Sequence, residues 1–222
     1  ACWCPPTWAA EGVRAMNAQT ERLVLQGEAG PIEALRDVPE GVSRGVAVVA
    51  HPHPLFGGTM DNKVVQTLAR ACVASGWQCL RFNFRGVGSS EGVYDEGRGE
   101  SQDLVALVEQ LAPDAPLVLA GFSFGAFVTC QAVQALWPTG RLKKIMLVGT
   151  AVSHFPASPL PLDAHEHTLV IHGESDDTVA LSAVMDWARP QQLPVTVFPG
   201  TGHFFHGQLP LLKSLAMRHL RA

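Results

Sequence analysis

The sequence predicts an α/β domain built on a mostly parallel central sheet, with helices on both faces and an antiparallel hairpin at one edge. Two observations carry this prediction. Apolar runs of strand length alternate along the chain with segments of helical periodicity, and the first two strand segments flank a turn. Strands that alternate with helices form right-handed βαβ units, and such units build parallel sheets covered on both faces.

Strands are expected where short apolar or alternating runs end at glycine, proline or polar residues. The first two form the edge hairpin, and the continuous apolar run at residues 45–50 has the composition of a strand buried on both faces. The predicted strands are residues 22–26, 32–36, 45–50, 78–84, 117–120, 143–149, 168–172 and 195–198.

Helices are expected between the later strands, where apolar residues recur at spacings of three and four. The first of them begins at a capping residue, Asp61 or Asn62, and ends at Gly76. The predicted helices are residues 61–75, 97–111, 126–136, 179–188 and 209–220. A glycine-rich loop at residues 85–92 lacks the Lys-Ser/Thr pair of a phosphate-binding loop, so no nucleotide cofactor is expected.

Length and composition fit one globular domain. The chain has 222 residues, of which 47% are hydrophobic and 16% charged, and its net charge is −4. We expect residues 21–222 to form the domain and residues 1–20 to be an irregular extension, with Met16 as a possible native start and an ordered arm as the alternative. The lack of a basic patch argues against a nucleic-acid partner, and no apolar run reaches membrane-spanning length.

The five cysteines indicate a reducing compartment rather than a disulfide framework, because their number is odd. Cys72, Cys79 and Cys130 lie in apolar contexts and are expected to be small buried residues. Cys2 and Cys4 lack a matching Cys/His pair, so no metal is expected there. Because no basic region leads into an apolar segment at the N-terminus, we expect a cytoplasmic protein.

The chemistry is expected to centre on Gly-Phe-Ser-Phe-Gly at residues 121–125, between a predicted strand and a predicted helix. This pattern in this setting is the nucleophile elbow, a turn so tight that a Cβ at either flank would clash. The alternative is that Ser123 only caps the helix. Further along the chain, Asp176 and Asp177 follow one strand, and His203 and His206 follow another. The order Ser, Asp, His is the order of a nucleophile, its orienting acid and its base in this kind of sheet.

Four motifs make the chain resemble the α/β-hydrolase superfamily from about residue 21 onward. They are His-Pro-His-Pro-Leu-Phe-Gly-Gly-Thr-Met-Asp-Asn at 51–62, the elbow at 121–125, His-Gly-Glu-Ser-Asp at 172–176 and Gly-His-Phe-Phe at 202–205. Within it, the chain resembles the small lidless serine group related to dienelactone hydrolases. The resemblance implies Asp176 rather than Asp177 as the acid and His203 rather than His206 as the base. Dienelactone hydrolases carry cysteine at the nucleophile position, so Ser123 favours carboxylesterase chemistry.

Two backbone amides are expected to form the oxyanion hole. One is Phe124, directly after the nucleophile. The other lies in the loop after the 45–50 strand, where Pro52 and Pro54 are excluded because they have no N–H. By similarity to the dienelactone-type loop, Leu55 is predicted, with His53 and Phe56 as alternatives.

The loop at residues 150–166 occupies the position where many members of this superfamily insert a lid, so the site is expected to be shallow and open. Its candidate lining residues, for which plain loop packing is the alternative, are Phe56, Tyr94, His154 and Phe155. His51 and His53 lack further ligands and are expected to fix their loop by hydrogen bonds rather than to bind metal.

The predicted function is hydrolysis of small acyl esters through an acyl-enzyme, without a cofactor, a membrane or a nucleic acid, by a monomer or homodimer. The alternatives are thioesterase, acyltransferase or small-peptide hydrolase chemistry with the same residues, and a non-catalytic protein of this fold that binds a small ligand.

Overall fold

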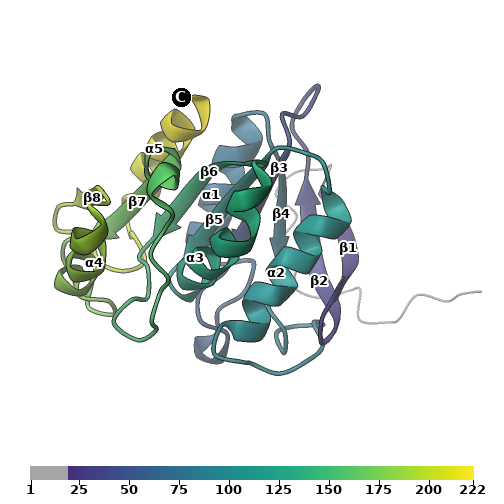
Figure 1. Ribbon diagram of the computed structural model, residues 1–222, viewed down its shortest axis with the longest axis horizontal. Coiled ribbons are helices and arrows are strands. Elements are labelled where there is room, and N and C mark those ends of the chain that lie inside the picture. The colour runs from purple at the N-terminus through teal and green to yellow at the C-terminus, as the bar shows by residue number, and fades with distance from the viewer. Residues whose placement is uncertain (1–19) are drawn as a thin grey trace, which may run out of the picture.

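The structure is a computed structural model that describes residues 20–222, so the predicted extension lies outside the described residues except for Thr20. The strands form one eight-stranded sheet in the order β1-β2-β4-β3-β5-β6-β7-β8 (Figure 1). They are β1 (Glu21–Gly27), β2 (Gly30–Asp37), β3 (Val46–Ala50), β4 (Gln78–Phe82), β5 (Leu117–Phe122), β6 (Leu142–Val148), β7 (Thr168–Gly173) and β8 (Val195–Phe198).

Within residues 20–222, four α-helices connect strands and a fifth follows the last strand, and the predicted fold class is confirmed. They are α1 (Lys63–Ala74), α2 (Arg98–Leu111), α3 (Phe124–Leu136), α4 (Leu181–Ala188) and α5 (Leu209–Arg221). β1 pairs antiparallel with β2, and β2 pairs antiparallel with β4. Every other neighbouring pair is parallel, as βαβ connections require. No helix within residues 20–222 is both long enough and apolar enough to cross a membrane.

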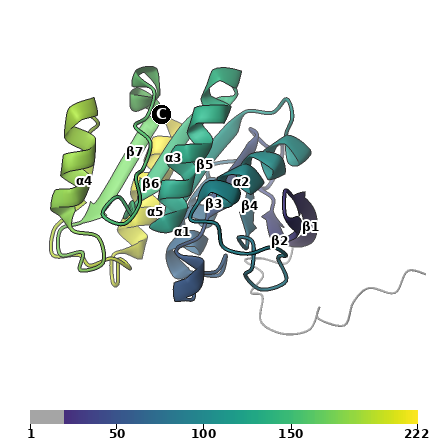
Figure 2. The same ribbon diagram turned by 60° about the horizontal axis from the view of Figure 1, so that its bottom comes forward.

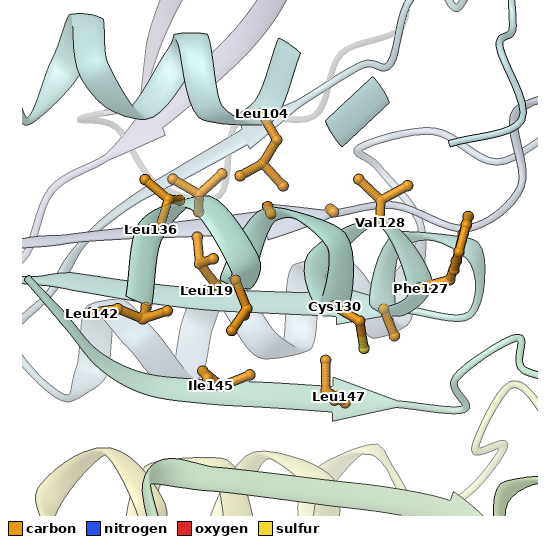
Figure 3. Close-up of a cluster of buried hydrophobic side chains, with 14 of the residues drawn as sticks. Leu104, Leu119, Phe127, Val128, Cys130, Leu136, Leu142, Ile145 and Leu147 are labelled. Atoms are coloured by element: carbon orange, nitrogen blue, oxygen red, sulfur yellow. The ribbon is translucent and has the colours of Figure 1, made fainter. Parts of the chain in front are cut away.

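The helices cover both faces of the sheet, and each face has its own core. α2, α3 and α4 pack on one face, and α1 and α5 pack together on the other (Figures 1 and 2). β5 lies between β3 and β6, and all six of its residues are buried. In Figure 3, Leu119 of β5 belongs to the same buried cluster as Leu104 of α2, side chains of α3 and Ile145 of β6. A strand buried on both faces explains the unbroken apolar run before Ser123.

Several element boundaries differ from prediction by a few residues, and two of them do so because side chains capture backbone amides. The predicted strand at 78–84 ends at Phe82 as β4, and the Phe84 N–H donates to His51 Nε2 at 3.0 Å instead of to a neighbouring strand. The predicted helix at 179–188 begins at Leu181, because the Val179 N–H donates to Asp176 Oδ1 at 2.7 Å. Both captured amides lie next to candidate site residues.

Short 3₁₀ helices supplement the predicted elements at Pro54–Phe56, Trp137–Thr139, Leu162–His167 and Arg189–Gln191. The third of them lies in the predicted loop at 150–166, so that connection is partly helical. Cys72, Cys79 and Cys130 are free and buried, as predicted, and Cys2 and Cys4 lie outside the described residues.

Candidate active site

Ser123 lies at the apex of the turn between β5 and α3, with a left-handed backbone of φ 57° and ψ −116°. Such a conformation is strained for any residue with a Cβ and persists only where the surroundings enforce it. Here the Ser123 N–H donates to the Val148 carbonyl at 2.8 Å, and the Ser123 carbonyl accepts from Ala126 and Ala151. These bonds fix the serine to β6, to α3 and to the loop after β6.

The two glycines of the turn are required by close contact rather than by their φ angles. A Cβ at Gly121 would lie 2.2 Å from the carbonyl oxygen of Gly125. A Cβ at Gly125 would lie 2.3 Å from the Ala50 carbonyl oxygen at the end of β3. The loop after β3 therefore approaches the start of α3 closely, which brings its amides toward Ser123.

Replacing Gly125 with alanine is expected to destabilise the protein by about 3 kcal/mol, because backbone atoms must shift to relieve the contact. Urea denaturation followed by circular dichroism measures this loss. Gly202→Ala is the matched control: a Cβ there would meet only the Ser175 carbonyl oxygen, at 3.8 Å. Equal stability of the two variants would show that the turn tolerates a side chain at position 125.

Hydrogen bonds join Ser123, His203 and Asp176 in one chain. His203 Nε2 lies 3.0 Å from Ser123 Oγ, and His203 Nδ1 lies 2.7 Å from Asp176 Oδ2. All three residues are buried, with 4–7% of their surface exposed. The alternatives Asp177 and His206 are exposed and lie outside this chain of bonds. Gly149 makes room for the base, since a Cβ there would lie 3.2 Å from His203 Cε1.

Asp176 is held in its charged form. Burial alone would raise the pKa of this carboxyl, but the hydrogen bonds that it accepts from His203 and from the Val179 N–H outweigh burial and lower the pKa. Its Oδ1 accepts from the Thr178 and Val179 amides, which leaves Oδ2 for His203 Nδ1–H. His203 Nε2 is therefore the unprotonated nitrogen, and the Ser123 hydroxyl donates to it.

His172 is a residue beside the acid that the sequence reasoning used only as part of a motif. It is fully buried, and its Nε2 lies 2.8 Å from the Val179 carbonyl oxygen and 3.4 Å from Asp176 Oδ2. Burial lowers the pKa of His172, so the ring stays neutral. Its Nε2–H holds the turn that carries Asp176. The position of this histidine four residues before Asp176 was the available signal.

The backbone amides that are predicted to form the oxyanion hole differ in whether their N–H groups already have a hydrogen-bond acceptor. Phe124 is the first residue of α3, so its N–H has no acceptor within the helix. The Leu55 N–H donates to His53 Nδ1 at 3.2 Å, and the Phe56 N–H donates to the His53 carbonyl at 3.2 Å. The Leu55 N–H could therefore bind an oxyanion only if its hydrogen bond to His53 Nδ1 were broken. Among the candidate loop amides in the described chain, the His53 N–H is the one without an acceptor.

The His53 ring is the centre of an aromatic cluster at the mouth of the site. Ring centroids of Phe56, Tyr94, Phe124 and Phe155 lie 4.7, 5.0, 5.0 and 5.7 Å from that of His53. Since Nδ1 accepts from Leu55, the ring proton is on Nε2, which lies 3.2 Å from the Tyr94 hydroxyl. Burial and the nearby His154 lower the pKa of His53. The structure thus gathers three of the four predicted lining residues around one ring.

The fourth predicted lining residue, His154, connects two loops instead. Its Nε2 lies 3.1 Å from the Thr178 carbonyl oxygen, in the turn that follows Asp176. Within residues 20–222, no group of three or more His, Cys, Asp or Glu side chains is placed to hold a metal ion.

The buried side chain of His51 fixes the loop after β3 through two hydrogen bonds. Its Nδ1–H donates to the Pro52 carbonyl at 2.6 Å, and its Nε2 accepts from Phe84. Complete burial of the ring lowers the pKa of His51 to about 3. The folded state therefore requires the neutral ring, whereas the unfolded chain protonates near the ordinary histidine value.

Because the unfolded state binds this proton first, the stability that His51 contributes is fully present above about pH 6.5 and is lost as pH falls from there toward 3. At pH 5 the loss is about 2 kcal/mol, at 1.36 kcal/mol per unit. Urea denaturation at pH 7.5 and pH 5 should show this extra loss of stability in wild type and not in His51→Gln. Other titrating groups contribute equally to both proteins, so subtracting the two losses isolates the contribution of His51. Parallel pH dependence would contradict it.

Comparison with known proteins agrees with this fold. The family model described as the alpha/beta hydrolase fold matches residues 53–167, about half of the chain. This chain therefore belongs to the α/β-hydrolase family, and its fold is that of a hydrolase.

Individual proteins are also similar to this chain in structure or in sequence. A Xanthomonas campestris structure described as an α/β serine hydrolase without a lid is 36% identical and covers 94% of this chain and 97% of its own, with a TM-score of 0.82. A Coxiella burnetii serine hydrolase homologue is also 36% identical, covering 94% and 100%, with a TM-score of 0.78. The human mitochondrial palmitoyl-protein thioesterase ABHD10 is 29% identical over 51% of this chain and only 35% of its own length.

Proposed function

We propose that this protein is a serine carboxylesterase that cleaves small acyl esters through an acyl-enzyme. The observation that carries the proposal is the continuous hydrogen-bond chain from Asp176 through His203 to Ser123, at 2.7 and 3.0 Å. A serine hydroxyl becomes a nucleophile when a base accepts its proton, and the base needs an anion to fix its tautomer.

In the proposed mechanism, Ser123 Oγ attacks the ester carbonyl carbon as His203 Nε2 takes its proton. Asp176 stabilises the resulting imidazolium. The imidazolium then gives its proton to the leaving alcohol oxygen as the C–O bond breaks, and the acyl group remains on Ser123. Water, deprotonated by His203, attacks the acyl carbonyl, releases the acid and returns the proton to Ser123 Oγ.

The oxyanion of each tetrahedral intermediate is assigned to the Phe124 N–H and one amide of the loop after β3. The His53 N–H serves in the conformation described, whereas the predicted Leu55 N–H serves only after it leaves His53 Nδ1. The 5.0 Å separation of the His53 and Phe124 rings supports a position of this loop beside the nucleophile.

Thioester hydrolysis is the second candidate function, and it is favoured by the similarity to the human protein named as a palmitoyl-protein thioesterase. The same triad serves acyl transfer from sulfur, from nitrogen and to acceptors other than water, so the fold does not decide among them. The non-catalytic alternative fits the geometry poorly, because a ligand binder has no use for an acid and a base bonded in series to a serine.

The test is covalent labelling by a fluorophosphonate probe, followed by intact-mass measurement. We expect wild type to gain one adduct and Ser123→Ala to gain none. Ser175→Ala is the matched control, because this neighbouring serine is exposed and lies next to the acid in sequence. A folded wild type that stays unlabelled would contradict the proposal. If the protein turns over ester and thioester substrates equally well, thioester hydrolysis stands beside ester hydrolysis as a proposed activity.

A further inference from the structure

A cavity of about 790 Å³ lies next to the proposed active site, between the start of α2, one face of α3 and residues 154–156. Its volume is within the range of small-molecule sites. It is continuous with the aromatic mouth of the site, because Tyr94 and Phe155 line it as well, and His154 lines it beside them.

The α3 face of the cavity leads away from the nucleophile. Its lining residues Phe127, Gln131 and Gln134 follow Phe124 at spacings of 3, 7 and 10 residues, which places all four on one side of the helix. At about 1.5 Å of rise per residue, the cavity runs from roughly 6 to 16 Å from Ser123 along the helix axis. It therefore has the length for an extended substituent of the substrate.

The α2 wall of the cavity is held in an unusual backbone conformation. Glu96 and Gly97 have successive positive φ angles of 54° and 93°. Fully buried Glu100 accepts hydrogen bonds from the Asp95 and Gly97 amides, at 2.9 and 2.8 Å, and fixes this turn. A Cβ at Gly97 would lie 2.3 Å from Phe127 Cε1, so the turn packs directly on the cavity floor.

The cavity is aromatic near Ser123 and polar farther away. Phe127 and Phe155 stack with ring centroids 4.9 Å apart and an interplanar angle of 18°. At the far end, Gln134 Nε2 donates to the Pro159 carbonyl at 3.0 Å and holds the wall in place. The side chain of Gln102, which also lines the cavity, makes no hydrogen bond with another residue among residues 20–222, so its amide group is available to a ligand.

The cavity offers no unbalanced charge. Arg98, its one cationic lining residue, pairs with Asp95 at 2.9 Å and with Glu96 at 3.7 Å. An anionic ligand would have to compete with these carboxylates. Neutral groups that donate and accept hydrogen bonds fit glutamine side chains better.

The cavity and the base lie on opposite sides of Ser123. His203 approaches the serine from the β8 side of the sheet, whereas α2 covers the half that contains β1, β2 and β4 (Figure 1). A leaving group must lie beside His203 to receive its proton. The cavity on the other side therefore faces the acyl part of the substrate.

We propose that this cavity is the acyl subsite, and that it selects an uncharged acyl group with an apolar stretch next to the carbonyl and an amide or hydroxyl at its far end. This inference rests on the proposed serine-hydrolase function. It predicts poor use of plain long-chain alkyl acyl groups, since their ends would desolvate the Gln102 side chain without giving it a hydrogen-bond partner.

Three p-nitrophenyl esters test the subsite: the acetate, the octanoate and an ester of the same chain length as octanoate in which an acetamido group ends the acyl chain. Wild type should favour the acetamido ester over octanoate by about tenfold in kcat/KM, the effect of one well-made hydrogen bond. Gln102→Leu should remove this preference. The control Gln66→Leu, on α1 at the opposite face of the sheet, should keep it.

Ser101 of α2 also lines the cavity, so filling the cavity with Ser101→Trp gives the second arm of the test. It should lower kcat/KM for both long esters at least tenfold relative to kcat/KM for the acetate. A uniform response of the three esters to Ser101→Trp would overturn the assignment of the cavity to the acyl group. A wild-type preference for octanoate would overturn the amide or hydroxyl class. If folded wild type hydrolysed none of the three esters and was not labelled by the fluorophosphonate probe, the proposed serine-hydrolase function itself would be refuted.

Discussion

Replacing His203 with glutamine is expected to lower kcat for p-nitrophenyl acetate by about 10⁴ to 10⁶, because glutamine cannot accept the proton of Ser123 Oγ in the transition state. KM should change little, since His203 contacts the serine and the acid rather than the acyl cavity. Steady-state kinetics measures both constants, and circular dichroism shows whether the variant is folded.

His206→Gln is the matched control for this experiment. This histidine is exposed, and its ring lies 6.1 Å from that of Phe204, outside the bonded chain. Its variant should retain kcat within twofold. If His206→Gln rather than His203→Gln lost activity, the bonded chain would not be the catalytic one, and the base would have to be reassigned.

Replacing Asp176 with asparagine is expected to lower kcat by about 10⁴. The Oδ1 of an asparagine would keep accepting from the Thr178 and Val179 amides, so its NH₂ group would face His203 Nδ1. Nδ1 would then have to accept a hydrogen bond, which moves the ring proton to Nε2. A protonated Nε2 cannot take the proton from Ser123, so the geometry would survive while the tautomer is wrong.

Asp177→Asn separates this effect from a general loss of charge near the site. Asp177 is exposed, and its one described hydrogen bond is from the Thr178 hydroxyl at 3.5 Å. We expect activity within twofold of wild type for this variant. Similar losses in both variants would indicate that charge near the loop after β7, rather than the tautomer of His203, controls the rate.

The sequence predicted the sheet, its edge hairpin and the helices on both faces, because each follows from local periodicity. It also predicted which strand ends would meet, since the carboxyl ends of parallel strands share one edge of the sheet. Ser123 was therefore placed together with Asp176 or Asp177 and with His203 or His206 without knowledge of any distance.

The sequence predicted that His51 and His53 fix their loop by hydrogen bonds, but it did not show which backbone groups their side chains capture. Nothing in local periodicity shows that His53 Nδ1 takes the Leu55 amide or that His51 takes the Phe84 amide 33 residues away. The choice of Asp176 over Asp177 came from a family motif, because two adjacent carboxylates are equivalent until the turn that bonds one of them is known. The α2–α3 cavity depends on the packing of Gly97 against Phe127, which joins segments about 30 residues apart.

The left-handed backbone of Ser123 means that the residue needed for the proposed reaction lowers the stability of the fold at that position. A β-carbon at φ 57° costs on the order of 1–3 kcal/mol, which glycine would recover. Glycine would also delete the hydroxyl. A library of this protein selected for heat resistance alone would therefore enrich inactive molecules at position 123, and engineering for thermal tolerance needs turnover as a second criterion.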